Sequence, residues 1–138
     1  MINVVLDTNV LLVIVPIQSP YAYLYNDFKC GKFRISISSE ILLEYEEQLK
    51  NRYKANSVDI ELNELLENKH TNLVTPDFNW NYITADPDDN KFVDCAIASN
   101  ADFIITNDKH FAILQTILFT KVNTLTLQQF IELLEKTA

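Results

Sequence analysis

Short apolar runs along the chain alternate with longer segments in which apolar residues recur every three or four positions. Runs of the first kind are typical of buried strands, and spacing of the second kind is typical of helices that bury one face. The runs predict strands at residues 2–6, 34–37, 72–75, 103–105 and 119–125. The spacing predicts helices at residues 10–15, 20–28, 57–68 and 127–134, and two more that begin at Ser38 or Ser39 and near Asp88 or Asp89.

Strands and helices take turns through the whole length, which favours an α/β fold. Because the strands are short and apolar, the central sheet is predicted to be mainly parallel, with helices on both faces, in three α/β/α layers. The chain has 138 residues, 48% of them hydrophobic, and a single Gly, so we expect one domain over residues 1–138. In such sheets, ligands bind beyond the carboxyl ends of the strands, where the strand order reverses.

The composition bears on where the protein is expected to work. The longest apolar run, at residues 10–16, is too short to cross a bilayer, and no basic region precedes it. Neither membrane insertion nor secretion is therefore predicted. Cys30 and Cys95 are far apart and lack metal-ligand spacing, so we expect reduced thiols and a cytoplasmic location.

The net charge of −8 argues against a protein that binds nucleic acid through a basic face. It does not exclude an enzyme whose bound cations bring a phosphate in. Basic residues do gather in two places, and these are either a path for phosphates or a solvated rim. The two groups are Lys29, Lys32 and Arg34, and Lys50, Arg52 and Lys54.

Four acidic residues are predicted to meet at one edge of the sheet. Asp7 directly follows the first strand, and Asp108 follows the strand at residues 103–105 after a Thr-Asn turn. Asp89 begins a helix, and Glu44 lies about two turns into the helix after the second strand. Gathered carboxylates repel one another, so a protein that gathers them usually holds a cation. Oxygen ligands favour Mg²⁺ or Mn²⁺, which bind phosphate oxygens and activate water.

Each of these acids also has a purely structural interpretation. Asp7 and Asp89 are good caps for the helices that follow them, and Asp108 suits a turn. Glu44 belongs to a Glu-rich helix, which is usually the sign of a solvated face. The hypothesis of a functional site therefore depends on the joint placement of the four acids.

Four segments, in order and in spacing, resemble the acidic motifs of PIN domains. They are residues 5–10 (VLDTNV), 39–45 (SEILLEY), 86–92 with 95–98 (DPDDNKF and CAIA), and 101–108 (ADFIITND). Asp7, Glu44, Asp89 and Asp108 stand at the acidic positions of these motifs. The resemblance covers nearly the whole chain and is strongest to the toxin components of bacterial toxin–antitoxin pairs.

This resemblance implies a PIN fold and an endoribonuclease that hydrolyses RNA phosphodiester bonds. The four acids would be both the catalytic residues and the ligands of Mg²⁺ or Mn²⁺. The resemblance also implies a homodimer and a protein antitoxin as a partner. Asn9 and Thr106 are then expected to support the acids rather than bind metal, or else only to make turns at strand ends.

The third acid is open between Asp89, which fits the motif best, and Asp94. These two lie about 140° apart around a helix at 100° per residue, so both are not expected to reach one metal. Asp86 and Asp88 are expected to be loop acids. His110 follows Asp108 closely and either touches a phosphate or is simply exposed at a helix start.

Two other functions fit parts of the pattern. Phosphatases of the haloacid-dehalogenase type also have a strand that ends in Asp, but their second acid is replaced here by Asn9. A catalytically silent PIN-like module for binding a partner is the second alternative. The apparently complete set of acids argues against it, and metal binding without cleavage would favour it.

Overall fold

A parallel five-stranded sheet forms the centre of the protein. The computed structural model describes residues 1–118 and 120–137. The strands lie in the order β3-β2-β1-β4-β5, and every neighbouring pair is parallel. Their bounds are Asn3–Leu6 (β1), Arg34–Ile37 (β2), Thr71–Leu73 (β3), Phe103–Ile105 (β4) and Thr124–Leu125 (β5). The mainly parallel sheet expected from the sequence is thereby confirmed.

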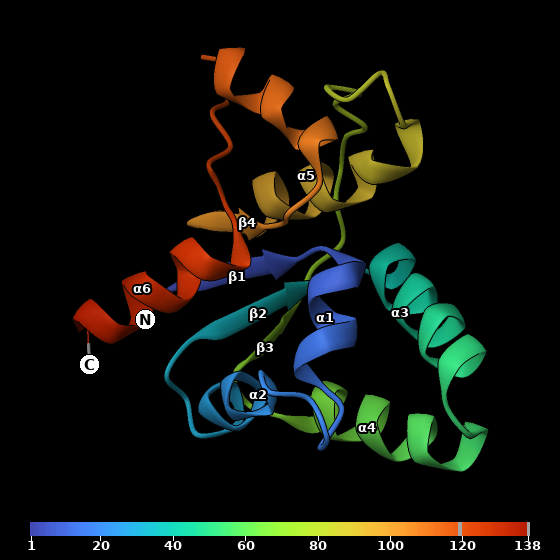
Figure 1. Cartoon of the computed structure of the whole chain (residues 1–138). Coiled ribbons are helices and arrows are strands. Elements are labelled where there is room, and N and C mark those ends of the chain that lie inside the picture. Colours follow the sequence, from blue (N-terminus) through green and yellow to red (C-terminus); the bar gives the residue numbers. More distant parts are fainter. Residues whose placement is uncertain (119, 138) are drawn as a thin grey trace.

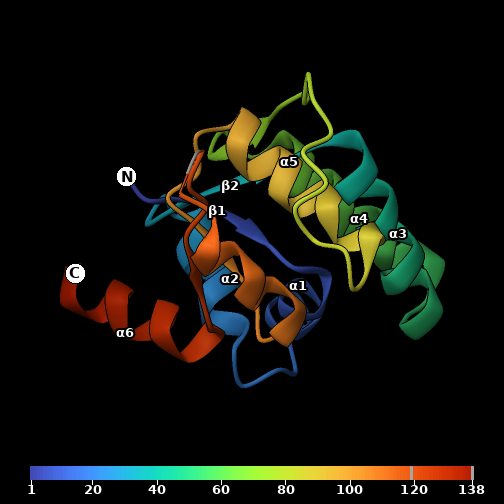
Figure 2. The same ribbon diagram turned by 90° about the horizontal axis from the view of Figure 1, so that it is seen from above.

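Helices cover both faces of this sheet. Figure 2 shows β1 and β2 between α5 on one side and α1 and α2 on the other, which confirms the three-layer α/β/α arrangement. None of the helices among the described residues has the length and apolar character needed to cross a membrane. The α-helices are Thr8–Ile14 (α1), Ala22–Lys29 (α2), Ser39–Arg52 (α3), Ala55–Glu67 (α4), Asn90–Ala98 (α5) and Leu127–Thr137 (α6). Two 3₁₀ helices, Pro87–Asp89 (η1) and Lys109–Thr116 (η2), precede α5 and follow β4.

The central strands β1, β2 and β4 are largely apolar because side chains on both of their faces are buried. Val4, Val5, Ile35 and Ile104 are fully inaccessible to solvent. A strand with one solvated face would instead alternate apolar and polar residues. Among the polar strand residues, Ser36 is buried in β2, where its hydroxyl donates to the side chain of Asn3 in β1 at 2.5 Å.

Local chemistry fixes where the helices begin and end. The Ser38 hydroxyl accepts a hydrogen bond from the amide of Ile41, so Ser38 caps α3 as one of the two predicted caps. Helix α2 ends at Lys29, and Gly31 follows with a φ of 88°. A Cβ at this position would lie 2.7 Å from the ring of His70, so the turn requires glycine for its backbone angle and for space.

Some element boundaries and one buried face differ from the sequence prediction. The last strand was expected at residues 119–125, but only Thr124–Leu125 is a strand, because Thr120 has a φ of 51° and Phe119 lies outside the described residues. The apolar spacing that predicts a helix at residues 57–68 counts Ile60 among its apolar positions, yet Ile60 is 60% exposed. Val58, Leu62 and Leu65 make the buried face instead, and Ile60 lies between them in sequence on the opposite side.

Strand order reverses between β1 and β4, and this places the candidate site. From β1 the chain moves to β2 and β3 on one side, and later returns to β4 and β5 on the other. Leu6, the last residue of β1, lies opposite Ile105, the last residue of β4. Strands β1 and β4 lie side by side (Figure 1). Asp7 and Thr106, the residues that follow these strands, therefore emerge next to each other at the carboxyl edge of the sheet.

Candidate active site

Asp7 is a buried carboxylate at the point where β1 ends. Its side chain Oδ2 accepts a hydrogen bond of 2.7 Å from the hydroxyl of Thr106, which follows β4. Asp7 directly precedes helix α1, and its side chain makes no N-cap hydrogen bond, although a hydrogen bond with the backbone of Thr8, the first residue of α1, lowers its pKa. N-capping of α1 therefore does not explain why an acid stands at this position.

The surroundings of Asp7 disfavour its negative charge. Burial raises the pKa of the Asp7 carboxyl above its ordinary value, and it outweighs the opposite effect of the Thr106 hydrogen bond. The nearby charges of Asp108 and Glu44 raise this pKa further. Two of the other predicted acids thus lie close enough to Asp7 to repel it.

Asp108 is joined to Asp7 through the same threonine. The amide of Asp108 donates to the Thr106 hydroxyl at 3.0 Å, while that hydroxyl donates to Asp7. The Asp108 carboxylate accepts the amide of His110 at 2.9 Å and so caps η2. The structural role allowed by the sequence is therefore real, and it holds Asp108 beside the site.

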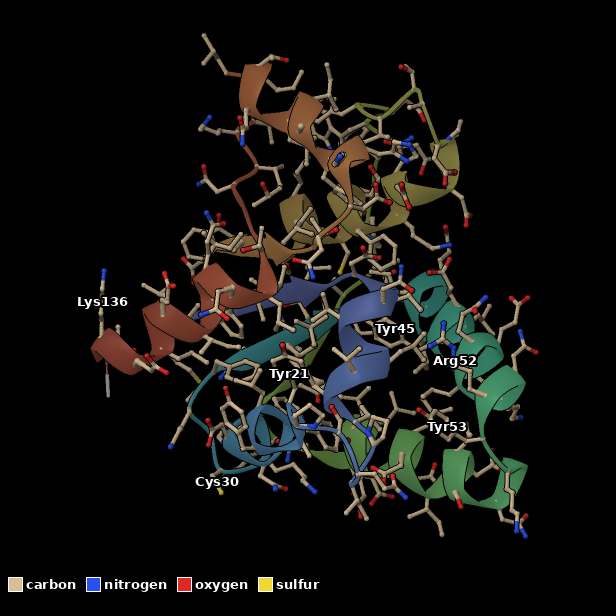
Figure 3. All side chains as sticks on the ribbon, in the orientation of Figure 1. Tyr21, Cys30, Tyr45, Arg52, Tyr53 and Lys136 are labelled. Carbon is tan, nitrogen blue, oxygen red and sulfur yellow. The ribbon has the colours of Figure 1, made fainter. Side chains whose placement is uncertain are left out.

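Glu44 reaches the site from α3 and has a partner at each oxygen. Oε2 accepts the hydroxyl of Thr8, and Oε1 lies 2.5 Å from the ammonium of Lys91. Tyr45, the next residue, is fully buried between α1 and α3, and its hydroxyl donates to the carbonyl of Leu6 (Figure 3). This bond ties α3 to the end of β1 and so sets the position of Glu44.

Lys91 is a component of the site that the sequence analysis did not single out. Its side chain is only 10% exposed, and its ammonium lies 3.0 Å from Asp88 Oδ1 in addition to its contact with Glu44. Burial lowers the pKa of Lys91, but its bonds to Glu44 and Asp88 outweigh this and raise the pKa above the ordinary value. Lys91 is therefore a charged residue that neutralises one of the four acids.

Asp89 stands at the junction of η1 and α5 and faces Asp7 and Asp108. Its Oδ2 is buried and has no hydrogen-bond partner among the described residues. Burial, together with the charges of Asp86, Asp108 and Asp7, raises the pKa of Asp89 to about 6, although His110 acts in the opposite direction. Asp89 makes no capping hydrogen bond to the described part of α5, and Asp86 caps η1 instead.

Asp94 points elsewhere. Its Oδ1 accepts the backbone amide of Trp80 at 2.9 Å, in the loop that follows β3. Burial raises the pKa of Asp94, and among the acids it is Glu40 that adds to this rise. The charges of Asp7 and Asp108 act on Asp89, whereas Glu40 is the acid that acts on Asp94. Asp89 ends η1 and Asp94 lies in α5, so the two are not on one regular helix as the sequence argument assumed.

Of the two expected supporting residues, Thr106 contacts the acids directly, as described above. Asn9 is exposed, and the residue that binds an acid at the start of α1 is its neighbour Thr8. We call Asp7, Glu44, Asp89 and Asp108 the acid cluster. The charges of Asp108 and Glu44 raise the pKa of Asp7, and the charges of Asp108 and Asp7 raise the pKa of Asp89.

Comparison with protein families assigns the chain. A family model described as the PIN domain matches residues 3–110, a range that contains all four acids and all but the C-terminal part of the fold. The chain belongs to the PIN domain family. PIN domains are generally nucleases, and nucleases of this family generally use divalent metal ions.

Solved structures share this fold at low sequence identity. VapBC2 from Rickettsia felis, bound to a DNA fragment from its promoter, superimposes with a TM-score of 0.63 at 17% identity and covers 91% of this chain and 98% of that one. The RRP44 PIN domain of T. brucei gives a TM-score of 0.56 at 16% identity, covering 99% of this chain and 83% of that one. At these identities the likeness concerns the fold alone. No curated protein matches the chain significantly.

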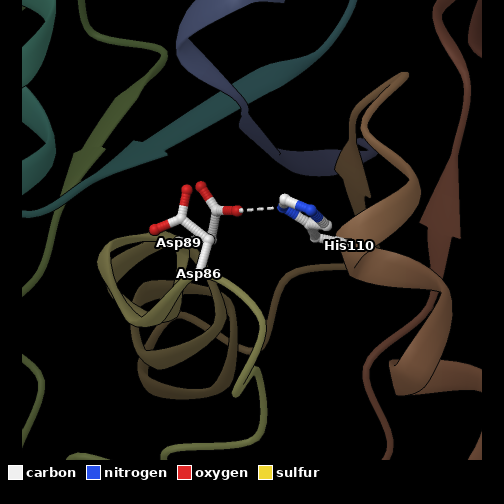
Figure 4. Close-up of side chains that lie close together, drawn as sticks. All are labelled: Asp86, Asp89 and His110. Carbon is white, nitrogen blue, oxygen red and sulfur yellow. Dashed lines mark ion pairs between the residues drawn. The ribbon is translucent and has the colours of Figure 1, made fainter.

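The residues of this PIN domain fit a divalent cation. A buried carboxylate oxygen without a hydrogen bond, such as Asp89 Oδ2, costs free energy unless a cation or another donor satisfies it. Ligand atoms of Asp86, Asp89 and His110 lie within 4.8 Å of one another (Figure 4). Asp86 was expected to be an ordinary loop acid and His110 an exposed residue, and their closeness to Asp89 could not be found from spacing along the chain.

Proposed function

We propose that this PIN domain is an endoribonuclease that hydrolyses RNA phosphodiester bonds with Mg²⁺ or Mn²⁺ held at the acid cluster. The observation that carries the proposal is Asp89 Oδ2, a buried oxygen without a hydrogen bond from any described residue, close to the charges of Asp7 and Asp108. Burying several carboxylates together is unfavourable without a cation, and a site that retains this arrangement is suited to one.

The side chains have distinct tasks in this proposal. Asp89 would hold the cation, and the nearby negative charges of Asp7 and Asp108 would add to the attraction. Thr106 orients Asp7 by donating to its Oδ2. When bound, the cation supplies polarisation of a phosphate oxygen and activation of a water. Lys91 neutralises Glu44, which reduces the repulsion that the acid cluster presents to an approaching phosphate.

The charge of the protein limits how RNA is bound. With a net charge of −8, the protein as a whole repels a phosphate backbone, so binding depends on the cation and on local basic residues. Arg52 and Lys54 lie at the end of α3 and just before α4, which is the second basic group of the sequence (Figure 3). We therefore expect RNA to bind weakly when metal is removed.

The proposal extends to partners and location. By its resemblance to toxin components, the protein would act in the cytoplasm, form a homodimer and be inhibited by a protein antitoxin. Support comes from family membership and from the fold shared with VapBC2. Co-expression with the product of an adjacent gene, followed by size-exclusion chromatography, tests whether a stable complex forms.

The test of the nuclease is cleavage of labelled, single-stranded RNA of mixed sequence by the purified protein, with Mn²⁺ or with EDTA. The site variant carries Asp7→Asn and Asp89→Asn. A matched control carries Asp59→Asn and Asp77→Asn, which remove the same charge from two exposed positions. We expect cleavage that requires Mn²⁺, that persists in the control and that disappears in the site variant.

Other results would contradict the proposal in different ways. Cleavage that survives in the site variant would assign the activity to a contaminant. An absence of cleavage, with Mn²⁺ still raising the melting temperature, would favour the binding module. The ion pair between Lys91 and Glu44 is the observation that favours this alternative, because it occupies one of the four acids.

A further inference from the structure

A histidine stands beside the acid cluster, although the set of residues expected from the sequence contained only oxygen ligands. His110 is the second residue of η2, two positions after Asp108, and its side chain faces η1 across the site (Figure 4). Its Nδ1 lies 3.6 Å from Asp89 Oδ2 and 3.5 Å from Asp108 Oδ1. The His110 side chain thus lies between Asp89 and Asp108 and reaches them from η2.

The distances fit coordination of a single ion. Divalent ions have bonds of about 2.0–2.2 Å to nitrogen and oxygen, so opposite ligand atoms lie about 4.2 Å apart. The ligand atoms of Asp86, Asp89 and His110 lie within 4.8 Å of one another, which is close to that spacing. Asp89 Oδ2, the buried oxygen without a hydrogen bond, is the atom that faces His110 Nδ1.

The charges also favour this part of the site for the ion. Glu44 already contacts the ammonium of Lys91 and the hydroxyl of Thr8, so both of its oxygens have partners. Asp86, Asp89 and Asp108 have no lysine or arginine among their described ion pairs, and His110 is the basic side chain beside them. A cation that enters the site therefore has the most favourable electrostatic energy near η1 and η2, where the negative charges are least offset.

The kind of ligand determines which ion binds best. Mg²⁺ is a hard ion that favours oxygen ligands, whereas imidazole suits transition metals. We propose that His110 Nδ1 is a metal ligand together with Asp86 and Asp89, and that this nitrogen makes the site prefer Mn²⁺ and other transition-metal ions to Mg²⁺. This inference rests on the metal site of the proposed function, but it does not require that RNA be the substrate.

The chain contains only two histidines, and this permits a direct test. His70 lies just before β3, at the amino edge of the sheet, and serves as an internal control. In full-length protein with ¹⁵N-labelled imidazoles, Zn²⁺ is added as a diamagnetic probe. We expect the Nδ1 resonance of His110 to move while the nitrogen resonances of His70 stay in place. Stoichiometric Zn²⁺ binding that leaves His110 Nδ1 unmoved would overturn the inference.

Selectivity gives a second measurement. Affinities for Mn²⁺ and Mg²⁺ are measured by electron paramagnetic resonance of free Mn²⁺, alone and in competition with Mg²⁺. We expect His110→Ala to weaken Mn²⁺ binding about tenfold or more and Mg²⁺ binding much less, whereas His70→Ala changes neither. An equal loss for both ions, or no loss, would contradict nitrogen ligation.

The outcomes separate this inference from the proposed function. If the His110 resonance moves but the protein does not cleave RNA, the proposed metal site is supported and the proposed nuclease activity is contradicted. If the protein cleaves RNA, binds Mn²⁺ and Mg²⁺ with equal affinity and leaves the His110 Nδ1 resonance unmoved, the nuclease activity is supported and the nitrogen ligand is contradicted. If no divalent ion binds, both fail together.

Discussion

The ammonium of Lys91 lies 2.5 Å from Glu44 Oε1, whereas Asp89 and Asp108 have His110 as their basic neighbour among the described ion pairs. Both side chains are largely buried, 10% exposed for Lys91 and 20% for Glu44. The pair divides the acid cluster into a neutralised part on α3 and an anionic part near η1. Because Lys91 offsets the charge of Glu44, the repulsion within the acid cluster is concentrated at Asp7, Asp89 and Asp108.

Replacing Lys91 by Met is expected to destabilise the metal-free protein by about 1–3 kcal/mol, because Glu44 keeps a partly buried charge without its counter-ion. Urea denaturation in EDTA measures this loss. The double variant Lys91→Met, Glu44→Gln is expected to lose less than the sum of the two single variants. Additive losses would mean that the two side chains do not stabilise each other.

Replacing Asp7 by Asn is expected to leave the protein folded and, in EDTA, slightly more stable. The amide can still accept the Thr106 hydrogen bond, while the repulsion by Asp108 and Glu44 disappears. Thermal unfolding with and without millimolar Mn²⁺ checks this, since the wild type should gain stability from the ion and the variant should not. Asp59→Asn is the control. A variant that does not fold would show that Asp7 has a structural role.

Asp89 should make stability depend on pH. Its folded pKa is raised to about 6, above the value near 4 of an unfolded chain, so the folded state binds a proton more tightly. The contribution of this proton is fully present below about pH 4 and is lost as the pH rises through about 6. In EDTA, the melting temperature of the wild type should therefore fall relative to that of Asp89→Asn as the pH rises from about 4 to about 6. A constant difference would contradict the raised pKa.

Asp94 and Asp89 should behave differently as variants. Asp94→Asn is expected to keep the stabilisation by Mn²⁺, because the Asp94 carboxylate contacts the loop and not the acid cluster. Trp80, the only tryptophan of the chain, reports on this contact, and its fluorescence should change in Asp94→Asn but not in Asp89→Asn. Loss of the Mn²⁺ effect in Asp94→Asn would make Asp94 the third acid.

The sequence was most informative where strands end. Placing Asp7 and Asp108 at one edge needed only the knowledge that parallel strands have their carboxyl ends together, and the pairing of Leu6 with Ile105 confirms that placement of the strand ends. The argument that separated Asp89 from Asp94 used the period of one α-helix, whereas Asp89 ends η1 and only Asp94 lies within α5. The first inference depends on regular backbone geometry, which a single sequence encodes well.

Contacts between side chains from distant elements were beyond the sequence. Lys91 and Glu44 lie on different helices, and their contact depends on how α5 and α3 are rotated about their axes. His110 was placed correctly as exposed at a helix start, but its approach to Asp89 depends on the course of η2 after β4. Asn9 was expected to support the acids, whereas Thr8 does so for Glu44, because α1 begins immediately after Asp7.

The hydrogen bond from Thr106 to Asp7 joins residues that are 99 positions apart. During synthesis the N-terminal half of the chain leaves the ribosome long before β4 exists, and β1 can then pair only with β2. The edge of β1 that pairs with β4 stays unpaired until residues 103–105 have been synthesised. Nascent and prematurely terminated chains thus carry Asp7 and Glu44 without Thr106 or Asp108. The acid cluster therefore cannot assemble until β4 has been synthesised and has paired with β1, when most of the chain has been made.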